Sequence, residues 1–236
     1  MTDAKGNILK NGRDYNLAYS KGRVKVGTYS VTVKMTGNYS GKVVKKFKIV
    51  PQKVGGLKAS QKKPTSLKLS WKKQSGVDGY QIFDTKQKKR IATVKGENSR
   101  LIKKLNPGKS YYYKVRSYKK VGDKVYYGGW SKTIAANTIP KTPKISSAVS
   151  DKRGKVLVKW NKQTSGSGYE LQYSTNSKFK KNALTKTVKK NTVTAASVKN
   201  LPSGKKYYVR VRAFRTINGK RVYGSYSNVR SVVVKK

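Results

Sequence analysis

Two ten-residue stretches combine aromatic and cationic side chains in a pattern that could bind anions. They read YYYKVRSYKK at 111–120 and YYVRVRAFRT at 207–216. Guanidinium and ammonium groups make charge-assisted hydrogen bonds to phosphate, sulfate and carboxylate groups. Aromatic rings between such cations could stack on sugar rings or bases. The chemistry that this pattern favours is binding of an anionic polymer along a row of cations.

A β-strand would sort these side chains onto two faces, because successive residues of a strand point to opposite sides of the sheet. The core-facing rows are then Tyr111, Tyr113, Val115 and Ser117, and Tyr207, Val209, Val211 and Ala213. The outward rows and the hairpins that follow them supply the predicted binding residues, with Tyr118 and Phe214 as further outward rings: Tyr112, Lys114, Arg116, Lys119, Lys120, Lys124, Tyr208, Arg210, Arg212, Arg215, Lys220 and Arg221. Charge reversal at Arg116 or Arg212 is expected to weaken binding without unfolding.

Residues for catalysis are scarce. The chain has no His and no Cys, so a Ser-His or Cys-His nucleophile is excluded. Its 8 acidic residues are scattered, and no pair has the spacing of a metal cage or a glycosidase carboxylate pair. Asp78 and Glu170 lie near Gly-Tyr turns and are expected to be surface or turn residues. We therefore expect no enzyme activity, no metal site and no cofactor.

The charge balance is extreme, with 57 Lys and Arg against 8 Asp and Glu, a formal net charge of +49. A total of 17 Tyr argues for a folded chain with a cationic surface rather than a disordered basic tail. Such a surface also keeps modules soluble and blocks pairing between sheet edges, which needs no ligand. Nucleic acid is expected to bind only without sequence readout, because no recognition helix or zinc ligand set is present.

Two segments of the chain are homologous. LSWKKQSGVDGYQIF at 69–83 aligns with VKWNKQTSGSGYELQ at 158–172, which pairs Trp71 with Trp160 at an offset of 89 residues. LNPGKSYYYKVRSY at 105–118 aligns with LPSGKKYYVRVRAF at 201–214 at an offset of 96. Short alternating apolar runs and turn signals such as PGK, SGK and NGK predict that both repeats are all-β. The Pro-containing TIPKTP at 138–143 suits a short linker between them.

The motifs of both repeats resemble the fibronectin type III family. The shared pattern is a Trp, a Tyr nine residues later, and then L-x-P-G-x-x-Y-x-x-x-V-R; its residues here are Trp71, Tyr80, Leu105, Pro107, Tyr111, Val115 and Arg116, and Trp160, Tyr169, Leu201, Tyr207, Val211 and Arg212, with the second proline moved to Pro202. The resemblance implies seven-stranded antiparallel sandwiches at 52–139 and 140–236. It also implies that Trp71 and Trp160 lie in the cores, and that the Tyr111 and Tyr207 hydroxyls tie their strands to the preceding turn.

The first 51 residues differ from the repeats. LKNGRDYNLAYS, VGTYSVTVKMTGNYSG and FKIVP resemble a small Ig-like repeat of Gram-positive bacterial surface proteins. Counterparts of that repeat's earlier strands are missing, so a partial Ig-like segment with three or four strands and a partly open edge is expected at 1–51.

Together these features predict an all-β row of tandem antiparallel β-sandwiches that acts as non-enzymatic binding or spacer modules. The expected setting is extracellular, in a secreted or surface bacterial protein, with no signal peptide or anchor in this chain and no stretch that enters a membrane. The expected partner is an anionic polysaccharide or a host cell-surface protein, and the expected state is a monomer. The alternative is a released soluble polypeptide that acts as a ligand for a host-cell receptor.

Overall fold

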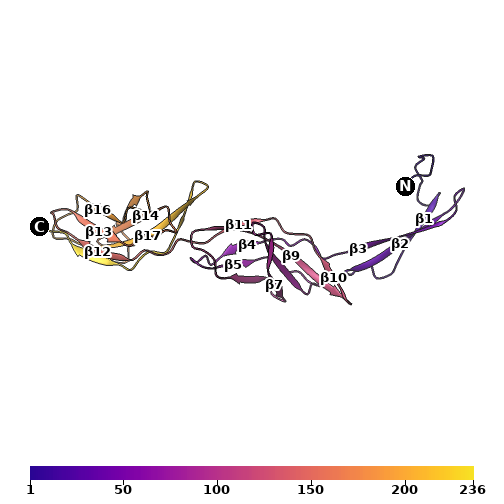
Figure 1. Cartoon of the computed structure of the whole chain (residues 1–236), viewed down its shortest axis with the longest axis horizontal. Helices are drawn as coiled ribbons and strands as arrows, with labels where there is room; N and C mark the ends of the chain where they lie inside the picture. The colour runs from indigo at the N-terminus through magenta and orange to yellow at the C-terminus, as the bar shows by residue number, and fades with distance from the viewer. The chain divides into compact units, whose positions relative to one another are not determined.

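The computed structural model describes residues 1–236 and consists of strands, turns and loops (Figure 1). All 19 elements are β-strands, which confirms the all-β prediction. No helix that could cross a membrane is present. The chain divides into two compact units, one of Met1–Leu57, Ser70–Ser99 and Tyr113–Ile134 and one of Lys58–Leu69, Arg100–Tyr112 and Ala135–Lys236. This division passes through the first repeat.

The N-terminal segment of the first unit forms a three-stranded antiparallel sheet. Strands β1 (Tyr15–Tyr19), β2 (Gly27–Met35) and β3 (Lys42–Ile49) lie in the order β1-β2-β3 (Figure 1). A loop with Gly37 and Gly41 at positive φ joins β2 to β3, a conformation that glycine adopts without steric cost. Three strands agree with the number predicted for this segment, and the β1 edge is partly open because Gly12 N–H bonds only the Tyr15 carbonyl there.

The larger sheet of the first repeat carries the YYYKVRSYKK stretch. Its order is β10-β9-β6-β7, made by β6 (Gly79–Asp84), β7 (Lys89–Lys95), β9 (Ser110–Val121) and β10 (Lys124–Tyr127), and β11 (Ile134–Asn137) also pairs with β9. Tyr113, Val115 and Ser117 are buried, whereas Tyr112, Lys114 and Arg116 are exposed or half-buried. The predicted alternation along this strand is therefore confirmed. The smaller sheet has the order β4-β5-β8, with β4 (Lys58–Ser60), β5 (Leu67–Ser70) and β8 (Ser99–Ile102).

The second repeat is a complete sandwich of two sheets (Figure 1). One sheet has the order β12-β13-β16, from β12 (Ile145–Val149), β13 (Val156–Trp160) and β16 (Ala195–Val198). The other has the order β15-β14-β17-β18, from β14 (Gly168–Ser174), β15 (Leu184–Val188), β17 (Lys206–Ile217) and β18 (Lys220–Tyr223), and β19 (Arg230–Val233) also pairs with β17. Both sheets contribute to one core, in which Trp160, Tyr169, Leu171 and Val211 are almost fully buried.

Two structural features of the Gly-Tyr pairs recur in both repeats. The Tyr80 hydroxyl accepts a hydrogen bond from Gln74 N–H at 2.7 Å, and the Tyr169 hydroxyl accepts one from Gln163 N–H at 2.7 Å. Each tyrosine thus closes the loop that precedes its own strand. In front of Tyr169 stands Gly168, where a Cβ would collide with the carbonyl oxygen of Val188. Packing therefore requires glycine before the tyrosine, since the neighbouring strand leaves no room for a side chain.

Candidate functional site: a stacked cation and aromatic face on each repeat

The outer face of the β10-β9-β6-β7 sheet carries a row in which cations and rings alternate. The Arg116 guanidinium lies 3.9 Å from the ring centre of Tyr127 and 4.5 Å from that of Trp130. Its Nε and Nη2 donate to Gln81 Oε1 at 3.0 and 2.9 Å. Since the rings and the sheet surround it, burial lowers the pKa of Arg116 from its usual value. Arg116 is thus held in place rather than free in solvent.

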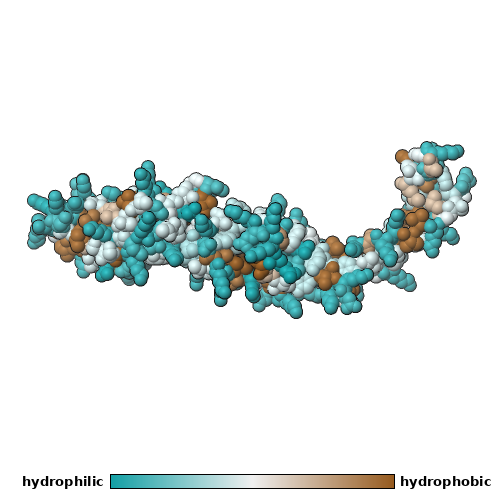
Figure 2. All heavy atoms as spheres, viewed as in Figure 1, coloured by the Kyte–Doolittle hydropathy of each residue, from teal (hydrophilic) through white to brown (hydrophobic).

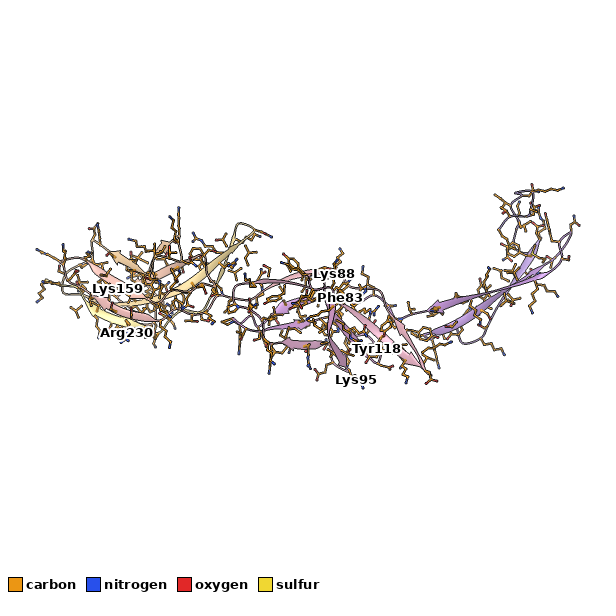
Figure 3. The ribbon with its side chains drawn as sticks, in the orientation of Figure 1. Phe83, Lys88, Lys95, Tyr118, Lys159 and Arg230 are labelled. Carbon is orange, nitrogen blue, oxygen red and sulfur yellow. The ribbon has the colours of Figure 1, made fainter.

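Lys114 extends this row on the same strand. Its Nζ lies 5.0 Å from the ring centre of Phe83 and 4.7 Å from that of Trp130, within the range of cation–π attraction. Phe83 is on β6, next to β9, which also bears Tyr118 (Figure 3). The order along the face is therefore Phe83, Lys114, Trp130, Arg116 and Tyr127.

The second repeat builds the same row with different residues. The Arg210 guanidinium lies 4.1 Å from the Phe179 ring centre and 4.0 Å from that of Tyr226. The Arg212 guanidinium lies 3.8 Å from the ring centre of Tyr223 and 4.5 Å from that of Tyr226. Tyr226 therefore takes the central place that Trp130 has in the first repeat, with one cation on each side.

A buried carboxylate completes the second row. Glu170 Oε1 accepts from Arg212 Nε at 2.8 Å and from the Tyr226 hydroxyl at 2.9 Å, and Arg212 Nη2 lies 2.7 Å from the same oxygen. Burial and the Glu170 hydrogen bond raise the pKa of Tyr226 to about 12. The expectation that Glu170 is a surface or turn residue is wrong: it lies within β14 and is 8% exposed. Local sequence suggested a turn because Glu170 follows Ser-Gly-Tyr, whereas the strand begins at the glycine.

A serine after each central ring holds the row in register. Val115 N–H donates to Ser131 Oγ at 3.0 Å, and Val211 N–H donates to Ser227 Oγ at 3.1 Å. These bonds tie the segments that carry Trp130 and Tyr226 to the long strands, although neither segment is a strand itself. GWS at 129–131 aligns with SYS at 225–227 at an offset of 96 residues. This alignment is the sequence signal that could have identified Trp130 and Tyr226 as equivalent rings.

Comparison with known proteins decides the family. A sequence profile of the fibronectin type III domain matches residues 51–134 and 140–229, well over half of the chain. The chain belongs to the fibronectin type III family. Among solved structures, the chicken CNTN1 FN1-FN3 domains share 18% identity at a TM-score of 0.41, covering 89% of this chain and 78% of that one. A two-domain fibronectin type III segment of chicken tenascin shares 20% identity at a TM-score of 0.46, covering 78% of this chain and 99% of that one. No curated protein sequence matches this chain.

The core tryptophans of both fibronectin repeats lie where the resemblance placed them. Trp71 and Trp160 are each 3% exposed, and their rings meet those of Tyr80 and Tyr169 edge to face at 5.2 and 5.3 Å. The two tyrosine corners differ from each other, however.

Asn106 N–H donates to the Tyr111 hydroxyl at 2.7 Å, so the predicted tie to the preceding turn is present in the first repeat. In the second repeat Pro202 stands where Asn106 would align, and proline has no N–H to donate. Tyr207 packs against the core instead, so its predicted hydrogen-bonding role does not apply.

The strand registers divide the predicted binding residues between two sides. Even-numbered residues of both long strands share the outer face, and the cross-strand pairs of the hairpins extend it to residues such as Lys120 and Arg221. Residues on the outer face are Tyr112, Lys114, Arg116, Lys120, Tyr208, Arg210, Arg212 and Arg221; those on the opposite side are Lys119, Lys124, Arg215 and Lys220. The structure therefore brings two thirds of the predicted set together within its repeats.

Two of the outer rings, Phe214 and Tyr208, are covered by neighbouring side chains, whereas Tyr112 is exposed. Phe214 was predicted to be an outward stacking ring, but it is 3% exposed because Tyr223 and the Arg221 guanidinium cover it, at 6.0 and 4.6 Å. Tyr208 is half-buried beneath Lys206, whose Nζ lies 5.6 Å from its ring centre. Tyr112 is 38% exposed.

The rows can bind anions through cation edges but offer few bare rings for sugar stacking, because the faces of the central rings already hold cations. No group of three or more His, Cys, Asp and Glu residues that could hold a metal ion is present. Fibronectin type III domains are generally non-enzymatic binding or structural modules and are typically extracellular. What the rows can do is therefore binding chemistry based on positive charge.

Proposed function

We propose that this chain is a non-enzymatic row of extracellular spacer and binding modules whose cationic faces hold an anionic polysaccharide. The charge count carries the proposal. Even if all 8 carboxylates paired with cations, 57 − 8 = 49 positive charges would have no counter-charge within the chain. An uncompensated surface of this kind attracts polyanions and releases their bound counterions.

The stacked rows support a defined site on this surface. Ring stacking and the hydrogen bonds to Gln81, Gln172 and Glu170 already restrict the arginines of the outer faces. A polymer that contacts them loses less side-chain entropy than one that must order free lysines. The exposed Lys120 and Arg221 lie on the same faces and add charge at the rim.

Retention of the whole chain on heparin and on a glycerol-phosphate polymer tests the proposal. We expect retention at physiological ionic strength and elution that depends steeply on salt, because release of counterions at some six to eight sites makes affinity fall by about 10³-fold between roughly 50 and 200 mM salt on duplex DNA. Elution at or below physiological salt would remove the proposal. Retention on DNA at low salt would not support it, since any chain of this charge binds DNA there.

Two substitutions in one hairpin provide a matched pair. Lys120→Gln removes an exposed cation from the outer face, and Lys124→Gln removes an exposed cation from the opposite side. A larger fall in elution salt for Lys120→Gln assigns binding to the outer face. Equal falls assign it to net charge alone. Reversal at Arg116 is a poor test, because the structure packs that guanidinium against Tyr127 and Trp130 and its replacement is expected to destabilise the repeat.

The lysine-rich composition and the N-terminal motifs support a place for these modules in a bacterial surface or secreted protein that meets host tissue. In that setting a host-cell receptor is the competing partner. It would appear as saturable cell binding that persists at about 0.3 M salt, where contacts between exposed charges are screened.

A further inference from the structure

The N-terminal sheet has one mainly apolar face, which also carries Lys45 opposite Val31. Cross-strand neighbours share a face, and the registers place Leu17 opposite Val33, Tyr19 opposite Val31, and Val33 opposite Val43. The Phe47 ring lies on the same face, 6.3 Å from the ring centre of Tyr19. Residues of the other face alternate with these and are mostly polar or cationic, among them Asn16, Thr32 and Lys34. The strands thus have the pattern of a sheet that packs on a second layer.

No second layer covers this face. Within β1, β2 and β3 only Gly27 is buried, while Leu17, Tyr19 and Val43 are 37%, 46% and 41% exposed. Figure 2 shows hydrophobic residues at the surface of this sheet, bordered by hydrophilic ones. A single-layer sheet of three strands gains little from burial, so a further strand paired at one edge would stabilise it through backbone hydrogen bonds and cross-strand side-chain contacts.

The edge at β1 can accept such a strand. Ser20 N–H donates to Ser30 O at 3.0 Å. In an antiparallel pair every second residue bonds to the partner strand, so the even-numbered residues of β1 direct their backbone groups towards β2. The backbone N–H and C=O groups of Leu17 and Tyr19 therefore point away from β2, along an open edge. No charged side chain lies in β1, whose sequence is YNLAY. The opposite edge, β3, carries Lys42, Lys45, Lys46 and Lys48, which disfavour strand addition.

Charge selects the partner. A second copy of this chain would bring another +49 to the contact, so repulsion opposes pairing of two copies. An acidic segment is attracted instead, since Lys21 and Arg23 follow β1 and the Arg23 guanidinium lies 4.8 Å from the ring centre of Tyr19 on that strand, whereas Arg13 is already paired with Asp14.

We propose that the β1 edge is a strand-addition site for an extended acidic peptide segment in which apolar residues alternate with Asp or Glu. The segment pairs with the backbone of Leu17 and Tyr19. Its apolar side chains extend the apolar face, and its carboxylates lie on the polar face. This site is separate from the polyanion-binding faces of the fibronectin repeats and does not depend on them.

A labelled ten-residue peptide of alternating Val and Glu, titrated into the whole chain and followed by fluorescence anisotropy, tests the proposal. Leu17→Pro removes an N–H that points away from β2, and proline is tolerated on such edges. We expect it to weaken binding by about tenfold or more. Val44→Pro is the matched control: Met35 N–H donates to Gly41 O at 3.0 Å, so the Val44 N–H points outward at the β3 edge. We expect Val44→Pro to bind within about twofold of wild type.

Hydrogen exchange of the unmodified chain gives a readout that requires no substitution. Peptide binding should slow exchange of the Leu17 and Tyr19 amides, which have no partner strand, more than that of β3 amides. The proposal is overturned if these amides stay unprotected, if Leu17→Pro binds like wild type, or if a Val-Lys peptide binds equally well. Self-association in sedimentation equilibrium that Leu17→Pro abolishes would assign the edge to a second copy. Binding to anionic vesicles without peptide binding would assign the face to lipid, and either result also overturns the proposal.

Discussion

Removing the Glu170 carboxylate should lower the free energy of unfolding of the second repeat more than the equivalent change at Gln81 lowers that of the first. Glu170 is 8% exposed and accepts hydrogen bonds from both Arg212 and Tyr226. Hydrogen bonds to a charged group contribute about 1.5–3 kcal/mol each, and truncation also leaves the donors without a buried acceptor. Because the Arg212 side chain is 25% exposed and can recover water, we expect Glu170→Ala to lower the free energy of unfolding of this repeat by about 3 kcal/mol.

The first repeat contains the natural comparison. Gln81 occupies the equivalent position and accepts two hydrogen bonds from Arg116 with a neutral oxygen. Glu170→Gln keeps an acceptor at the same place, so it should cost only about 1 kcal/mol, whereas Gln81→Ala removes an acceptor of the charged Arg116 and should cost about 1.5 kcal/mol. Glu170→Ala is thus expected to cost about 1.5–2 kcal/mol more than either change.

Native-state hydrogen exchange read by mass spectrometry is the assay, because peptides from β14 and β17 report on one repeat and peptides from β6 and β9 on the other. Glu170→Ala should lower protection in β14 and β17 by about 100-fold, at 1.4 kcal/mol for each factor of ten, and leave β6 unchanged. A loss below about 1 kcal/mol would refute the idea that this carboxylate organises the row. Equal losses for Glu170→Ala and Glu170→Gln would show that its acceptor geometry is unimportant.

Three further outcomes follow from individual contacts. Tyr111→Phe should cost about 1 kcal/mol in urea unfolding because it removes the bond from Asn106, whereas Tyr207→Phe should be close to neutral because Pro202 has no N–H. Gly168→Ala should cost about 1–3 kcal/mol, measured by the same unfolding curves, because its methyl group would meet the neighbouring strand. Burial and its Glu170 hydrogen bond raise the folded pKa of Tyr226 to about 12, so the stability that this phenol contributes is complete below its unfolded pKa of about 10 and is lost as pH rises towards 12. Thermal unfolding between pH 9 and 12 should therefore show a steeper alkaline loss than in Tyr226→Phe, and parallel curves would contradict this assignment.

Much of the fold could be predicted from short-range patterns. Alternation in YYYKVRSYKK placed Tyr113, Val115 and Ser117 inside, and the repeat offset paired Trp71 with Trp160. Both inferences rest on the period of two that a strand imposes on its side chains, which local sequence alone reveals. The same rule failed at Phe214, which the alternation places on the outer face. Tyr223 and Arg221 on the neighbouring strand bury this ring, and alternation along one strand does not show which side chains the next strand contributes.

Composition and spacing within single strands were enough to predict the all-β class, the duplication, the fibronectin motifs and the excess of positive charge. Packing between strands was needed to show that the outward arginines are stacked between rings, that Glu170 is buried beneath one of them, and that an apolar sheet face lies open near the N-terminus. These features arise where strands and loops distant in sequence meet. Strand pairing sets their register, and the pairing is selected by the packing of the folded chain.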